Sequence, residues 1–143
     1  MRAPNPTDQL MITRTTYSLK KTLASSMDQA DARVREELKR EGFGVLTEID
    51  VRSTLKEKLD VDFRPYKILG ACNPPLAHKA LTEEIDIGLL LPCNVVVYQG
   101  EDPGTSVVAI MDPVMQLGIA GREDMRPMAE EVKARMERVL AAL

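Results

Sequence analysis

The sequence predicts an α+β fold with two layers, in which helices pack on one face of a largely antiparallel five-stranded sheet. Short runs of β-branched and apolar residues follow one another through the middle of the chain, and an amphipathic helical pattern lies near each end. Consecutive strands with short connections favour antiparallel pairing, and the apolar face of such a sheet needs a helical layer. With 143 residues, the chain fits one hydrophobic core. We therefore expect a flexible N-terminal arm over residues 1–11 and a single domain over residues 12–143.

The first strand and the first helix are predicted in the N-terminal third. Residues 12–19 are rich in β-branched and aromatic types, which suit a strand. Ser26 and Gln29 have the spacing of a capping box, in which each side chain satisfies a backbone amide at the start of a helix. An apolar stripe follows at helical spacing, and Gly42 is placed to end the helix. The stripe consists of Met27, Ala30, Val34 and Leu38.

Two further strands and a short helix are predicted next. Apolar and β-branched residues alternate over 43–49, which indicates a strand. Asp50 then caps a short helix over 51–59, where apolar residues recur every four positions. A third strand follows over 66–71. Gly70 within it leaves room for a ligand or another backbone segment.

The second half of the chain continues this pattern. Asn73 precedes two prolines, and this order is typical of a helix N-terminus. The helix should run to about Leu81, and a short turn follows it. Strands over 95–98 and 107–111 should form a hairpin, because a turn-rich segment separates them. The last helix is expected from about Asp124, with a short turn before it.

Composition excludes several classes of function. The net charge is −3, and there are three Tyr, two Phe and no Trp, so the chain lacks the basic surface and aromatic platforms of a nucleic-acid-binding protein. No apolar run approaches the roughly 20 residues of a membrane-spanning helix. Two cysteines do not make a disulfide scaffold. We therefore expect a reduced cytoplasmic protein that binds neither nucleic acid nor membrane.

Three sequence blocks resemble a known family. They span residues 42–51, 70–78 and 87–95, and their order resembles that of the bacterial and archaeal family called domain of unknown function 302. The resemblance covers about residues 17–143. It implies an α+β fold of the TATA-binding-protein-like type, without a DNA-binding function, and it suggests a homodimer. The family brings no established activity, so the resemblance leaves the function open.

The candidate site contains both cysteines and the single histidine. If the third and fourth predicted strands pair antiparallel, Cys72 and Cys93 lie at the same end of the sheet, and the helix that carries His78 crosses between them. Two cysteines and one histidine suit zinc or a softer ion such as Cu(I). Asn73 and Asn94 each follow a cysteine and could contact the same ligand, although capping at strand ends also explains them.

Three functions remain open on these residues. The first is a small homodimeric binding protein whose Cys/His site holds a soft metal ion or a small molecule. The second is a thiol-dependent redox protein, in which Cys72 is activated by the start of the following helix and Cys93 resolves the intermediate. The third is a structural or interaction module, in which both thiols are simply buried as small apolar groups. The sequence favours the first function and does not identify the ligand.

Overall fold

The computed structural model of the protein describes residues 12–143, so the arm predicted for residues 1–11 lies outside them. Two of the helices, η1 and η2, are 3-10 helices. The elements in chain order are β1 (Thr13–Arg14), β2 (Ser18–Leu23), α2 (Met27–Arg40), β3 (Gly44–Asp50), α3 (Val51–Leu59), β4 (Tyr66–Cys72), α4 (Pro74–Glu83), η1 (Ile85–Leu90), β5 (Cys93–Gln99), β6 (Ser106–Met111), α5 (Pro113–Gly118), η2 (Glu123–Met125) and α6 (Arg126–Ala141).

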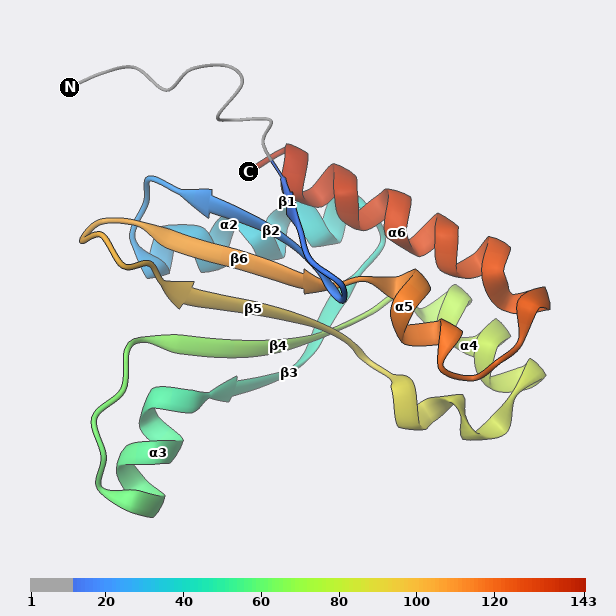
Figure 1. Cartoon of the computed structure of the whole chain (residues 1–143), viewed down its shortest axis with the longest axis horizontal. Helices are drawn as coiled ribbons and strands as arrows, with labels where there is room; N and C mark the ends of the chain where they lie inside the picture. The colour runs from blue at the N-terminus through green and yellow to red at the C-terminus, as the bar shows by residue number, and fades with distance from the viewer. Residues whose placement is uncertain (1–11) are drawn as a thin grey trace.

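The described strands form one sheet in the order β1-β2-β6-β5-β4-β3, and every neighbouring pair is antiparallel. The long helices α2 and α6 pack on one face of this sheet, as Figure 1 shows. The predicted α+β class is therefore confirmed. Within residues 12–143 no helix is both long and apolar enough to span a membrane.

The predicted strand count of five is wrong, because the segment 12–19 is not one strand. It forms the short β1, a turn and the start of β2. In the turn, the Ser18 amide donates to Oγ1 of Thr15 at 3.1 Å, and the two hydroxyl oxygens lie 2.6 Å apart. This local side-chain bonding competes with an extended strand and reverses the chain. The sheet therefore has six strands.

Lys21 on β2 faces the helical layer and is 3% exposed. Its Nζ donates to the carbonyl oxygens of Leu140 at 3.1 Å and Leu143 at 2.8 Å, just where α6 ends. Burial, followed by the charge of Arg33, lowers the pKa of Lys21. This lysine thus ties β2 to the C-terminal end of α6, and the sequence pattern alone did not place it in the core.

The local capping signals read from the sequence are confirmed. Ser26 and Gln29 form the reciprocal capping box of α2. At the other end of α2 the Gly42 amide donates to Lys39 and the Phe43 amide to Leu38, and Gly42 has a φ of 86°. These two bonds are those of a Schellman motif. Asp50 and Asn73 cap α3 and α4 through their side chains, as expected.

The buried side chains form two separate clusters. The main core lies between the sheet and the helices α2 and α6, and it includes Leu19, Val34, Leu69, Val97, Ile110, Met136 and Leu140. A smaller core is enclosed by α4, η1, α5 and the first turns of α6. Its buried members are Ala80, Ile87, Leu117, Met125, Met128 and Ala129. We call the region from α4 to η1 the α4–η1 lobe.

Candidate functional site

An apolar cavity lies where the two cores meet, at the end of β4 and the start of β5. Its free volume is about 40 Å³, within a recess of about 410 Å³ that is partly open to solvent. Its residues come from both cores, so the cavity separates two packed units. The lining consists of Phe43, Ala71, Cys72, Asn73, Leu76, Ala77, Ala80, Leu91, Pro92, Cys93, Leu117, Met128 and Val132.

Both cysteines border this cavity because β4 and β5 pair antiparallel, as the sequence predicted. Ala71 lies opposite Cys93 in the register. Burial, followed by the neighbouring Cys72, raises the pKa of the Cys93 thiol to about 11. At neutral pH Cys93 is therefore a neutral thiol with little thiolate character. It is suited to contact an apolar or soft group, and it is a poor nucleophile.

Cys72 and Cys93 are both free, and the register does not place them directly opposite each other. Cys72 is one position beyond Ala71, and Gly44 of β3 is its partner on the other side. Successive side chains of a regular strand point to opposite faces, and a disulfide requires Cβ atoms about 4 Å apart. An offset of one residue is unfavourable for such a bond.

Asn73 is a buried polar side chain of the cavity. It is 8% exposed, and its Oδ1 accepts a hydrogen bond from the Leu76 amide at 3.2 Å. A Cβ on Gly42 would lie 2.9 Å from Nδ2 of Asn73. The position of this side chain therefore depends on its role as the cap of α4 and on the absence of a side chain at Gly42.

The structure does not bring His78 or Asn94 into the cavity. His78 is exposed on α4, whereas Leu76, Ala77 and Ala80 line the cavity from the same helix. Asn94 is exposed and lies opposite Gly70. Among residues 12–143 there is no group of three or more His, Cys, Asp or Glu side chains placed to hold a metal ion. The expected convergence of Cys72, His78 and Cys93 is therefore not observed.

The space expected at Gly70 is filled by the protein itself. A Cβ at this position would lie 2.2 Å from Oγ1 of Thr47 and 2.8 Å from Cγ of Pro92. The peptide bond between Leu91 and Pro92 is cis. Gly70 thus allows the Pro92 ring to pack on β4 beside the cavity.

The apolar lining of the cavity was not predicted from the sequence. Phe43, Leu117 and Met128 come from distant parts of the chain, and they look like ordinary core residues in the sequence. No sequence signal distinguishes a side chain that lines a cavity from one that fills a core. Only the structure, in which the two cores meet, shows that these core residues also line a cavity.

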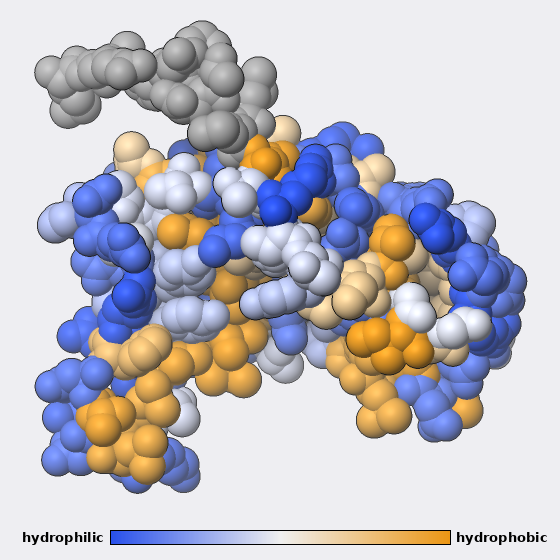
Figure 2. Space-filling view, in the orientation of Figure 1, coloured by the Kyte–Doolittle hydropathy of each residue, from blue (hydrophilic) through white to orange (hydrophobic). Residues whose placement is uncertain are grey.

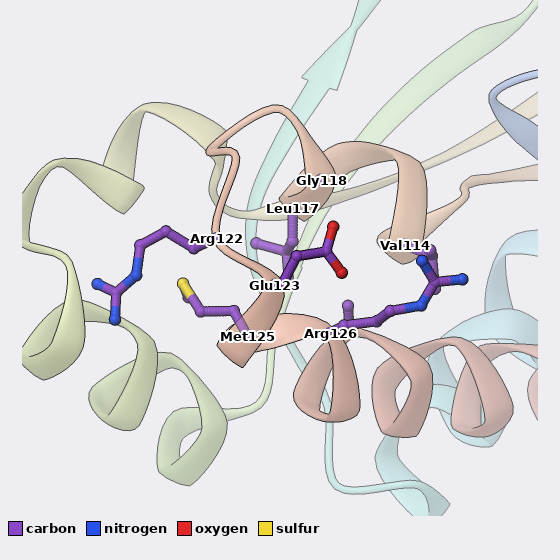
Figure 3. A pocket seen from close by; sticks show the side chains of 8 residues that line it. Val114, Leu117, Gly118, Arg122, Glu123, Met125 and Arg126 are labelled. Carbon is purple, nitrogen blue, oxygen red and sulfur yellow. The ribbon is translucent and has the colours of Figure 1, made fainter.

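A second cavity lies at the start of α6. Its basic residues are Arg122 and Arg126. Figure 3 shows their guanidinium groups pointing away from each other, and the Glu123 side chain lies between the two arginines. Nη2 of Arg122 lies 2.6 Å from Oδ2 of Asp124. Since the two arginines do not converge, they form no shared site for an anion.

These features define the class of protein: a two-layer α+β domain with an apolar, thiol-bordered cavity at the end of two central strands. Residues 19–143 match the family described as Domain of unknown function DUF302, and the chain belongs to that family. The chain is also similar to a solved structure, that of an uncharacterized conserved DUF302 protein from Bacillus stearothermophilus. The two are 32% identical with a TM-score of 0.81, over 90% of this chain and 98% of that chain. A comparison with curated proteins finds no match.

Proposed function

We propose that this protein is a binding domain for a small, largely apolar molecule, and that the ligand occupies the cavity beside Cys72 and Cys93. The observation that supports this proposal is the character of the lining, in which Asn73 is the single polar side chain apart from the two thiols. Ligand sites are usually concave and mostly apolar, with few polar groups that orient the ligand. The free volume of the cavity, about 40 Å³, is well below the usual range of such sites, so a bound molecule requires the lining to move apart.

The position of the cavity also supports this proposal. Phe43 and Val132 belong to the main core, whereas Leu117 and Met128 belong to the smaller core. A ligand between these groups would contact both cores and bury apolar surface on each side. Such binding should therefore stabilise the folded protein in proportion to ligand concentration.

A soft metal ion such as Zn²⁺ or Cu(I) is the alternative ligand, and the placement of both cysteines at one cavity favours it. It would have to displace the protons of both thiols, one of which has a pKa of about 11. His78 does not line the cavity, so a bound metal ion would need a further ligand besides the side chains of Cys72, Asn73 and Cys93. Reduced thiols at the site also suit a cytoplasmic location.

Benzene is a suitable first probe, because it is among the smallest apolar ligands and demands the least widening of a cavity whose free volume is about 40 Å³. We expect benzene to shift the NMR methyl resonances of Leu76 and Met128 and to raise the melting temperature of the protein. The variant Ala77→Leu adds bulk within the cavity and should abolish both effects. The matched control Ala134→Leu makes the same change at an exposed position of α6 and should leave both effects intact.

Metal analysis separates the two kinds of ligand. Protein purified without chelator is compared with the variant in which Cys72 and Cys93 are both replaced by Ala. One equivalent of Zn or Cu in the first protein and none in the second would favour the metal ligand. No response to benzene in the folded wild-type protein, at concentrations near saturation in water, would contradict the apolar-ligand proposal.

A further inference from the structure

The side-chain amide of Asn73 is bonded to the protein through its oxygen only. Oδ1 accepts a hydrogen bond from the Leu76 amide, and this bond identifies the atom as the oxygen, because a backbone amide can only donate. Nδ2 has two protons to donate, and it donates to no protein atom within residues 12–143. The side chain is nevertheless nine-tenths buried and lines the cavity. A donor in such a place is stabilised by an acceptor on a bound molecule.

The backbone at the start of α4 offers no further donor to a ligand. Pro74 and Pro75 have no amide proton. The next two amides, those of Leu76 and Ala77, donate to the side chain and to the carbonyl oxygen of Asn73. The free amides that usually bind anions at a helix N-terminus are therefore absent from this first turn. Nδ2 of Asn73 is the donor that remains there.

Gly42 leaves space on the nitrogen side of this amide. A Cβ on Gly42 would lie 2.9 Å from Nδ2 of Asn73 and 3.2 Å from Nη1 of Arg135. Phe43, the next residue along the chain, lines the cavity. The unpaired nitrogen therefore lies where the end of α2 meets the start of α4, beside the segment that contributes Phe43 to the lining.

The charged side chain nearest to this nitrogen on α6 is already paired. Nη1 of Arg135 donates to the carbonyl oxygen of Glu41 at 2.9 Å, and Nη2 donates to the carboxylate of Glu131 at 3.0 Å. The charge of Arg135 is therefore offset by that of Glu131. A carboxylate on a ligand would lose its hydration in the apolar cavity without gaining an unpaired cation. An uncharged acceptor avoids this cost.

The α4–η1 lobe, which supplies one side of the cavity, also does not favour an anion. Residues 74–90 contain one lysine and three acidic residues, which give a net charge of −2 with His78 neutral. One of the acidic residues, Glu84, is paired with Arg122. The lobe also exposes Ile85 and Leu89, and Figure 2 shows apolar surface on it. An uncharged, largely apolar molecule meets no repulsion at this lobe.

We propose that the ligand of the cavity is a small uncharged molecule with an apolar body and a carbonyl oxygen, such as a ketone or an ester, and that Nδ2 of Asn73 donates a hydrogen bond to this oxygen. The inference rests on the proposed function, because it names the ligand class of the same cavity. A carbonyl suits the site better than an alcohol. The hydroxyl proton of an alcohol would need an acceptor, and Oδ1 of Asn73 is already bonded to the Leu76 amide.

Three probes of nearly the same shape test this ligand class. They are 2-pentanone, 2-methyl-1-pentene and butyrate, and each has as many non-hydrogen atoms as benzene. The alkene replaces the carbonyl oxygen by a methylene group, and butyrate replaces the methyl group of the ketone by a charged oxygen. Dissociation constants come from titration of the NMR methyl resonances of Leu76 and Met128. In the wild-type protein, butyrate should bind at least about tenfold more weakly than 2-pentanone. Butyrate that binds as tightly as the ketone would overturn the uncharged class.

The variant Asn73→Asp tests the hydrogen bond itself. Aspartate has the same shape, caps a helix as well as asparagine does, and has an oxygen in place of Nδ2. It should weaken the binding of 2-pentanone at least about 5-fold more than that of 2-methyl-1-pentene. The matched control Asn94→Asp makes the same change at an exposed position outside the lining and should leave the ratio of the two dissociation constants unchanged. Circular dichroism and thermal unfolding check that both variants are folded.

The outcomes separate this inference from the proposal that the cavity binds apolar molecules. If Asn73→Asp changes the binding of ketone and alkene by the same factor, or if the wild-type protein binds the alkene and not the ketone, the hydrogen bond from Nδ2 is wrong and the cavity is still a binding site. If the wild-type protein binds neither molecule, both proposals are wrong. The comparison with butyrate uses the wild-type protein alone, so it decides the class of ligand even if Asn73→Asp does not fold.

Discussion

At the scale of single residues, the site is defined by what surrounds its thiols. Cys93 packs against the main core and borders the cavity, so its ionised form loses much of its hydration. Cys72 nearby raises the pKa of Cys93 further. The redox hypothesis gives Cys93 the resolving role, and a thiol with a pKa of about 11 attacks slowly at neutral pH. Its environment instead favours contact with apolar or soft partners.

The chemical reactivity of Cys93 should follow from this pKa. Alkylation by iodoacetamide requires the thiolate, so the rate at Cys93 should rise about tenfold per pH unit between pH 7 and 9 and continue to rise toward pH 11. Peptide mass mapping separates Cys93 from Cys72. In the protein unfolded by urea, the same cysteine should react faster, and its rate should level off near pH 9. If the alkylation rate of Cys93 in the folded protein levelled off below pH 9, its pKa would not be raised by burial.

The raised pKa of Cys93 also predicts a dependence of stability on pH. The folded state holds the proton more tightly than the unfolded state, so the stabilisation is complete below pH 9 and is lost as the pH rises from 9 to about 11. Two pKa units correspond to at most about 3 kcal/mol. Urea unfolding at pH 8 and pH 10 should show a larger loss for the wild-type protein than for Cys93→Ala. Equal losses would rule out this linkage.

At the scale of elements, Gly42 joins the end of α2 to the cavity. Its φ of 86° is rarely adopted by residues with a side chain, and an added Cβ would lie 2.9 Å from the Asn73 amide and 3.2 Å from Nη1 of Arg135. We expect Gly42→Ala to lower the free energy of unfolding by about 1–3 kcal/mol. Gly44→Ala is the matched control, because nothing lies within 4 Å of its added Cβ and its φ is not positive. It should change stability by less than about 1 kcal/mol, and similar losses in both variants would refute this account.

Local signals explain why most elements were predictable from the sequence. The capping box at Ser26, the caps at Asp50 and Asn73 and the glycine at position 42 each depend on residues within a few positions of one another. The turn at Thr15 was missed because β-branched residues suit both a strand and a side-chain-bonded turn. The amphipathic pattern identified the helices but did not show which part of their surface would border a cavity.

The candidate site was predictable only in part, for geometric reasons. Antiparallel pairing of β4 and β5 correctly placed Cys72 and Cys93 at the same end of the sheet. His78 was misplaced because its direction depends on the rotation of α4. Leu76, Ala77 and Ala80 face the cavity, and the helical period of 3.6 residues turns position 78 away from them. The rotation of a short helix is set by tertiary packing, which this sequence alone does not reveal.

At the scale of the whole molecule, the fold consists of a large core and a small one, with the cavity between them. The sheet, α2 and α6 enclose the main core, whereas the smaller core depends on short helices. Gln116 on α5 links these helices by donating from Nε2 to the carbonyl of Leu90. Regions with few buried apolar contacts open at a lower free energy than the main core of a protein. The α4–η1 lobe is therefore the part of the described chain best suited to open for ligand entry.

Hydrogen exchange should show this difference directly. Ile87 is 1% exposed and belongs to the smaller core. Ile87→Ala should cost about 2–5 kcal/mol locally and accelerate amide exchange in α4, η1 and α5 more than in β5 and β6. Leu89→Ala is the control, since Leu89 is in the same element but is 87% exposed. If ligand binding depends on an ordered lobe, Ile87→Ala should also weaken the binding of benzene, and Leu89→Ala should not. Uniform acceleration across the sheet and the lobe would mean that the two cores unfold as one unit.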